Sequence, residues 1–141
     1  MAKLIFAFLS IATSFCCLAQ TGKVILSVQR IQVSKGGEIS AGIFKKETFP
    51  KVGQQYIGKE IAVLSEQMQI VFESVPIGTY AMVAFQDIDK NKKLKSNFLG
   101  FPKEPIGFSR DAKINFGPPD FNDAKVEVQQ GKILTVSIIL R

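Results

Sequence analysis

The sequence contains no histidine and no tryptophan, and its only two cysteines, Cys16 and Cys17, lie next to each other near the amino terminus. Without histidine the protein has no imidazole general base, no Ser–His or Cys–His nucleophile pair and no imidazole metal ligand. Carboxylate chemistry is the main catalytic option that remains. We therefore expect a protein that is not an enzyme.

Residues 1–19 have the layout of a secretory signal peptide. Lys3 gives a short positively charged start, and a largely apolar run extends from Leu4 to Ala19. This run is shorter than the roughly 20 residues that span a bilayer as a helix, and no comparable run follows it. We expect cleavage after Ala19 and a secreted or periplasmic mature domain, residues 20–141, without a transmembrane segment.

Both cysteines would leave with this segment, so we expect a mature protein without thiol catalysis, redox sensing or a zinc–thiolate site. A lipid anchor on Cys16 or Cys17 is an alternative. We do not expect it, because Phe15 and Cys16 stand at the preceding positions, where a small residue is normally required.

Apolar residues after residue 19 recur with a period of two, which indicates half-buried β-strands. Turns that contain Gly or Pro separate the alternating stretches. The alternation predicts seven strands, around residues 24–28, 39–43, 57–63, 68–72, 80–85, 126–128 and 134–140. We therefore expect one all-β domain, an antiparallel β-sandwich of about seven strands with an immunoglobulin-like or transthyretin-like build.

The interval from Phe98 to Phe121 lacks this alternation and contains four prolines, three glycines and five phenylalanines. Loops of this length are uncommon in compact domains unless they are functional or disordered, and the aromatic content argues against disorder. We expect one long, packed loop whose rings mostly plug an end of the sandwich, with one or two presented to a ligand or partner. The candidate binding surface consists of Phe98, Phe101 and Phe108, with Lys103 and Glu104 as charges at its rim.

Four distinctive sequence elements lie between residues 72 and 124. They are a Val-Pro-x-Gly-x-Tyr-Ala turn and strand at 75–81, an acidic D-x-(D/N)-x-N run at 87–91, an N-F-L-G-x-P-x-E-x-x-G-F-S segment at 97–109 and a P-P-x-F-x-x-A segment at 118–124. This stretch resembles a family of small exported bacterial proteins, the domain of unknown function 2141. The resemblance implies fold and export, but the family has no established activity and so implies no mechanism.

The first of these elements also has a direct physical interpretation. Pro76 and Gly78 together favour a tight turn that leads into the next strand. Tyr80 then follows with a ring that we expect to point inward and a hydroxyl that can tie a neighbouring loop. We predict a structural role for this tyrosine.

The acidic run resembles the opening of a calcium-binding loop, because Asp87, Asp89 and Asn91 place oxygens at its positions one, three and five. The rest of the loop does not fit. Lys92 stands where the sharp turn needs glycine, and Phe98 stands where a bidentate glutamate is needed. We therefore expect a turn held by Asx hydrogen bonds, with no cofactor and no bound calcium, and these three residues remain the candidates for a metal site.

The formal net charge of +6 and the isoelectric point near 9.4 favour anionic partners. We do not expect nucleic acid, because the protein is expected to be exported and because its basic cluster, the lysines at positions 90, 92, 93 and 95, lacks interleaved aromatic residues. An unidentified envelope or extracellular protein, a glycan or an anionic surface is the expected partner. The predicted function is an exported, non-catalytic binding or accessory module of the cell envelope. The alternatives are a carboxylate-dependent hydrolase acting on envelope glycans and a purely structural envelope protein.

Overall fold

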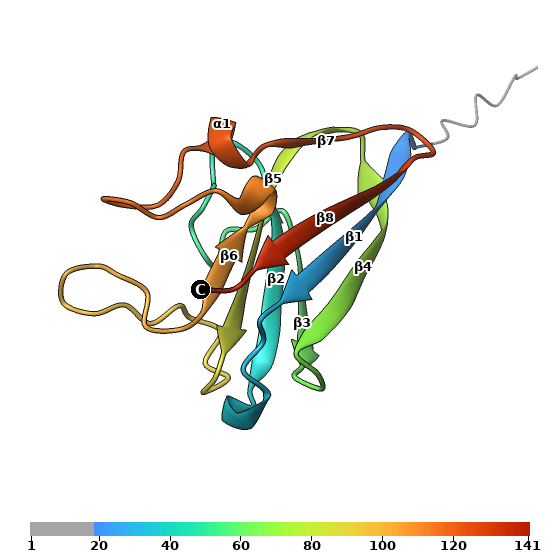
Figure 1. Cartoon of the computed structure of the whole chain (residues 1–141). Helices are drawn as coiled ribbons and strands as arrows, with labels where there is room; N and C mark the ends of the chain where they lie inside the picture. Colours follow the sequence, from blue (N-terminus) through green and yellow to red (C-terminus); the bar gives the residue numbers. More distant parts are fainter. Residues whose placement is uncertain (1–18) are drawn as a thin grey trace, which may run out of the picture.

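The computed structural model describes residues 19–141 as two facing β-sheets with short helical turns between some strands (Figure 1). The predicted signal peptide, residues 1–19, lies outside the described residues except for Ala19. The all-β sandwich expected from the alternating pattern is confirmed. The strands are β1 (Thr21–Gln29), β2 (Glu38–Phe44), β3 (Ile57–Ala62), β4 (Gln67–Pro76), β5 (Gly78–Asp87), β6 (Ile106–Phe108), β7 (Val126–Val128) and β8 (Ile133–Ile139).

One sheet has the strand order β4-β1-β8, and the other has the order β3-β2-β5-β6. Strand β7 pairs with the beginning of β5. Three short helical segments complete the fold: the 3-10 turns η1 (Val33–Lys35) and η2 (Ser109–Asp111), and the single-turn helix α1 (Phe121–Ala124).

The main core lies between the two sheets and follows the alternation of the strands. In β1, every second residue is buried, and Val24, Leu26 and Val28 are completely inaccessible to solvent. In β5, by contrast, both faces are buried. One face, which includes Met82, contributes to the main core, and the other, which includes Val83, belongs to a second cluster on the outside of the same sheet. This second cluster fixes the positions of the loops described below.

One strand pair departs from the predicted antiparallel arrangement. β8 runs parallel to β1, with Val24 opposite Leu134 and Val28 opposite Ile138. The other pairs among the named strands are antiparallel. Alternation of apolar residues reports which face of a strand is buried but carries no information about strand direction, so the sequence could not distinguish the two cases.

The interval predicted as one long loop is interrupted by regular structure, namely β6, η2 and the start of α1. Strand β6 pairs with β5 on one side. On its other side, Ile106 exchanges two main-chain hydrogen bonds of 3.0 Å with Arg141, just after β8. Gly107 is required here, because a Cβ atom at this position would lie 2.5 Å from the carbonyl oxygen of Ile139. Strand β6 thus joins the edges of the two sheets.

Tyr80 has the structural role predicted for it. Its side chain is buried, and its hydroxyl donates a hydrogen bond of 3.0 Å to the carbonyl oxygen of Pro76 at the end of β4. The bond fastens the turn between β4 and β5. Burial, and secondarily the nearby Tyr56, raise the pKa of the Tyr80 hydroxyl above its usual value.

Candidate functional site

Two loops project to the same side of the molecule, past the edge of the sheet at β6 (Figure 1). The first connects β5 to β6, and its outer part comprises residues 93–103; the second connects η2 to α1, and its outer part comprises residues 112–119. We refer to these two outer parts as the first and second tip loops. Both loops carry highly exposed apolar side chains: Phe98 is 96% exposed and Phe116 is fully exposed.

The first tip loop is held in shape by one asparagine. The side-chain oxygen of Asn97 accepts hydrogen bonds of 3.0 Å from the main-chain N–H groups of Leu99 and Phe101. The main-chain N–H of Asn97 donates to the carbonyl oxygen of Phe101, and Gly100 adopts a positive φ of 84° to close the turn. The turn therefore presents Phe98 and Leu99 to solvent on a preformed backbone.

An apolar groove of about 400 Å³ lies between the two tip loops. Its size falls in the range of small-molecule binding sites. Lys51 and Ser96 are the lining residues that carry a charge or a side-chain hydroxyl. The remaining lining residues are apolar or glycine: Pro50, Leu94, Leu99, Gly100, Phe101, Pro102, Ile106, Phe108, Ile114, Phe116, Gly117 and Pro118.

The two tip loops form two walls of the groove. An aromatic cluster fixes the position of its floor and of a third wall, formed by Pro50 and Lys51. Phe49, which precedes the lining residue Pro50, makes edge-to-face contacts with the rings of Phe44, Phe108 and Phe121, with ring centroids about 6 Å apart. This arrangement is the favourable one for aromatic pairs. It anchors the segment after β2 against β6 and α1, so the groove is built from three separate parts of the chain.

The exposed charges near the groove are mostly basic. Lys51, Lys93 and Lys103 are exposed, and none of them forms an ion pair within the part of the chain that the structure describes. Lys113, in the second tip loop, contacts Asp111 at 3.2 Å. The two tip loops contain no acidic residue; Asp120, just after the second, is exposed.

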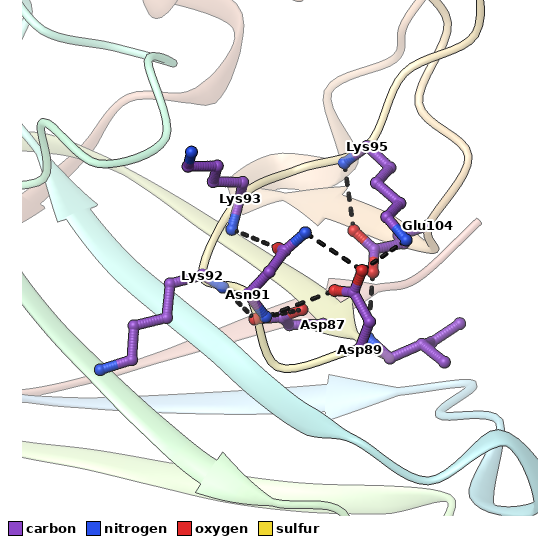
Figure 2. Close-up of polar contacts among 8 residues, drawn as sticks. Asp87, Asp89, Asn91, Lys92, Lys93, Lys95 and Glu104 are labelled. Carbon is purple, nitrogen blue, oxygen red and sulfur yellow. Dashed lines mark hydrogen bonds and ion pairs between the residues drawn. The ribbon is translucent and has the colours of Figure 1, made fainter.

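A cluster of carboxylates lies at the base of the first tip loop (Figure 2). Oxygen atoms of Asp87, Asp89 and Glu104 lie within 4.8 Å of one another. Both oxygens of Asp87 accept main-chain hydrogen bonds, one from Asn91 at 3.2 Å and the other from Lys92 at 2.7 Å. Asp89 and Asn91 each accept a hydrogen bond from the main-chain N–H two residues later, from Asn91 at 3.3 Å and from Lys93 at 2.8 Å, so the turn with Asx hydrogen bonds predicted for this run is confirmed.

Asp89, the second acid of the cluster, forms an ion pair with a lysine. The ammonium group of Lys95 contacts Asp89, and it is drawn beside that carboxylate in Figure 2. The hydrogen bond from Lys95 lowers the pKa of Asp89 below its usual value, and the same bond raises the pKa of Lys95. Asn91 adds a side-chain hydrogen bond of 3.1 Å to Asp89. The carboxylates thus act here as acceptors that shape the loop.

Two residues of the predicted binding surface are placed differently by the structure. Glu104 is not a rim charge: it is only 5% exposed, and its two oxygens accept hydrogen bonds from the main-chain N–H groups of Ile88 and Lys95. Phe108 is 4% exposed and belongs to the second core cluster, because β6 directs its ring towards Phe49. It reaches the groove only as part of the floor.

The other predicted surface residues do lie at the surface. Phe98, Phe101 and Lys103 are exposed, and Phe101 forms part of the groove wall. The prediction missed Phe116, although its neighbours Asn115 and Gly117 already indicated an exposed turn. It also missed Pro50 and Lys51, for which the sequence gives no indication, since they are distant in the chain and meet the loops only through packing.

Among the described residues, no helix has the length and apolar character needed to cross a bilayer. Fold and groove together define an all-β sandwich with an apolar groove between two projecting loops. The chain belongs to the family described as an uncharacterized protein conserved in bacteria (DUF2141), whose family model matches residues 26–135. This confirms the resemblance noted in the sequence. No curated protein and no solved structure matches the chain.

Proposed function

We propose that this protein is an exported, non-catalytic binding or accessory module of the cell envelope, and that its binding site is the groove between the tip loops. The observation that carries the proposal is the groove itself. It is concave and mainly apolar, and hydrogen bonds within the first tip loop support one of its walls. Four of the large apolar side chains exposed in the described chain gather on the two loops: Phe98, Leu99, Phe101 and Phe116. Concentrated exposed apolar surface marks binding sites.

A non-catalytic role is supported by the placement of the acidic residues. None of the described residues that line the groove is Asp or Glu. In the carboxylate cluster, Asp87 and Glu104 accept main-chain hydrogen bonds and Asp89 contacts Lys95. A glycosidase needs one carboxyl group free to act as acid and another free to act as nucleophile or base. The cluster is therefore better suited to holding the loop than to hydrolysis.

Site-specific cross-linking tests the binding proposal. The photoreactive substitution Phe101→p-benzoylphenylalanine places the reactive group in the groove wall, and the matched substitution Leu64→p-benzoylphenylalanine places it at a residue that is 77% exposed between β3 and β4. We expect adducts in the cell envelope at position 101 and not at position 64. Equal labelling at both positions, or none at position 101, would contradict the proposal.

Two further measurements test export and the hydrolase alternative. An intact mass that starts at Gln20 would support export with cleavage after Ala19, whereas a mass that retains Met1 would contradict it. Release of reducing ends from envelope glycans by the wild-type protein, abolished by Asp89→Asn, would favour the hydrolase and overturn the non-catalytic proposal.

A further inference from the structure

We propose that the tip loops dock on an anionic lipid bilayer, with Phe98, Leu99 and Phe116 entering the boundary between head groups and acyl chains. This inference rests on the proposed binding function of the groove and names the chemistry of its partner. It follows from the shape and charge of the two loops and from the hydrogen bonds that hold the first of them.

The shape of the apolar surface favours a bilayer. Phe98, Leu99 and Phe116 are 96%, 66% and fully exposed, and the loops that carry them project away from both sheets (Figure 1). A protein partner would need cavities that match two projecting rings, whereas a fluid bilayer accepts such rings without a preformed cavity. Single exposed apolar residues are ordinary at protein surfaces, but large aromatic side chains at two adjoining tips are not.

Main-chain hydrogen bonds within the first tip loop also favour its insertion into a membrane. The side chain of Asn97 accepts hydrogen bonds from the main-chain N–H groups of Leu99 and Phe101. The N–H of Gly100 donates to the carbonyl oxygen of Asn97, and the N–H of Asn97 donates to the carbonyl oxygen of Phe101. Main-chain groups that leave water for the acyl-chain region of a bilayer are costly unless they have hydrogen-bond partners within the protein. Several of those at the tip already have them, and the fixed turn lowers the entropy that insertion would cost.

Charge around the tips matches an anionic surface. The tip loops carry Lys93, Lys95, Lys103 and Lys113 without an acidic residue, and Lys51 lies on the groove wall between them. Two of these lysines contact acids of the protein itself, Lys95 at Asp89 and Lys113 at Asp111. Among the described residues, Lys51, Lys93 and Lys103 form no ion pair and supply the positive charge available to a partner. Basic side chains beside inserted apolar groups are the combination that binds proteins to the surface of anionic membranes.

The absence of tryptophan from the sequence allows a direct test. Phe98→Trp introduces a single fluorescent reporter at the proposed contact, and Leu64→Trp introduces one at an exposed control position. On vesicles of equal parts phosphatidylglycerol and phosphatidylcholine at low salt, we expect a blue shift and protection from aqueous quenchers for Phe98→Trp alone. On pure phosphatidylcholine, both effects should be much weaker.

Co-sedimentation with the same vesicles tests the residues. We expect Phe98→Ser/Phe116→Ser to lower vesicle affinity by about ten-fold or more, because two large apolar side chains no longer leave water. The control Leu64→Ser/Ile133→Ser changes residues that are 77% and 65% exposed outside the tip loops, and it should bind like the wild type. Thermal melting should be nearly unchanged for both double variants, since all four side chains are exposed.

Several results would overturn the inference. These are the absence of vesicle binding at low salt, equal binding by the Phe98→Ser/Phe116→Ser variant, or equal blue shifts at positions 98 and 64. Cross-linking at position 101 to a protein or a glycan, together with no vesicle binding, would overturn the lipid inference and leave the proposed binding function in place. The absence of both cross-links and vesicle binding would overturn both.

Discussion

The carboxylate of Glu104 accepts a hydrogen bond of 3.2 Å from the main-chain N–H of Lys95, nine residues earlier in the chain. Its other oxygen accepts one of 3.0 Å from the N–H of Ile88, so this single buried side chain ties both the start and the middle of the loop that leads to the first tip. The groove wall therefore depends on an acid that does not itself line the groove.

The substitution Glu104→Gln tests this dependence. A glutamine has one acceptor oxygen, so one of the two main-chain N–H groups would face the side-chain NH₂ instead. We expect a loss of about 1 to 3 kcal/mol in the free energy of unfolding. Chemical denaturation measures it, with Glu127→Gln as a control at an exposed position on β7. Equal losses in the two variants would show that Glu104 has no special structural role.

Truncation should separate the phenylalanines of the long interval by burial. Phe108→Ala removes a ring that is 4% exposed and packs against Phe49, so we expect a loss of about 3 to 5 kcal/mol. Phe101→Ala removes a ring that is 44% exposed, and its loss should be about 1 kcal/mol or less. Urea denaturation of the two variants measures the difference. Similar losses would contradict the assignment of Phe108 to the core.

Asp111 should give a stability difference that depends on pH. Hydrogen bonds from Arg141, and secondarily from Lys113, lower the pKa of Asp111 from 3.8 to about 2. A carboxyl whose pKa is lower in the folded state stabilises the fold above the unfolded value, and this contribution is lost as the pH falls towards the folded value. The contribution should therefore be present at neutral pH and disappear between about pH 4 and pH 2.

Asp111→Asn removes this charge and suits the backbone, since Asp111 has a positive φ of 52° that asparagine tolerates. We expect the wild type to melt at a higher temperature than the variant at neutral pH, and the two melting temperatures to converge as the pH approaches 2. Asp120→Asn, at an exposed position, is the control. A difference that persists unchanged at pH 2 would exclude the proposed ion pair as its cause.

Calcium should not change the thermal stability of the protein. Both oxygens of Asp87 already accept main-chain hydrogen bonds, and the ammonium of Lys95 contacts Asp89, so a cation would have to displace existing partners. We expect millimolar calcium to leave the melting temperature of the wild type the same within error. A rise that a chelator reverses would show that the carboxylate cluster binds the ion despite these contacts.

The sequence predicted best those parts in which each strand buries one face. The alternation of Val24, Leu26 and Val28 in β1 indicated both the strand and its buried side, and β1 has the predicted pattern. Strand β6 was missed because its three residues, Ile106–Phe108, are too few to show a period, and pairing with β5 alone defines it. The parallel direction of β8 is likewise a property of the assembled sheet.

The candidate site was predicted in part for a related reason. The aromatic content of the long interval indicated a segment that contributes to the groove, but identical residue types there have opposite environments. Phe98 is exposed because an asparagine-braced turn carries it outward, whereas Phe108 is buried because β6 holds it against Phe49. A glutamate is ordinarily exposed, so the burial of Glu104 follows only from the two main-chain groups that it meets.

The position of β1 between β4 and β8 has a consequence for the order in which the protein can acquire its structure. β1 is synthesised before any other strand, yet Val28 pairs with Ile138, 110 positions later in the chain. A nascent chain that emerges amino terminus first therefore cannot complete this sheet until its final strand is released. Closing so long a loop late makes folding slow compared with local pairing. Until β8 emerges, β1 can pair with β4 alone, and its other edge stays open.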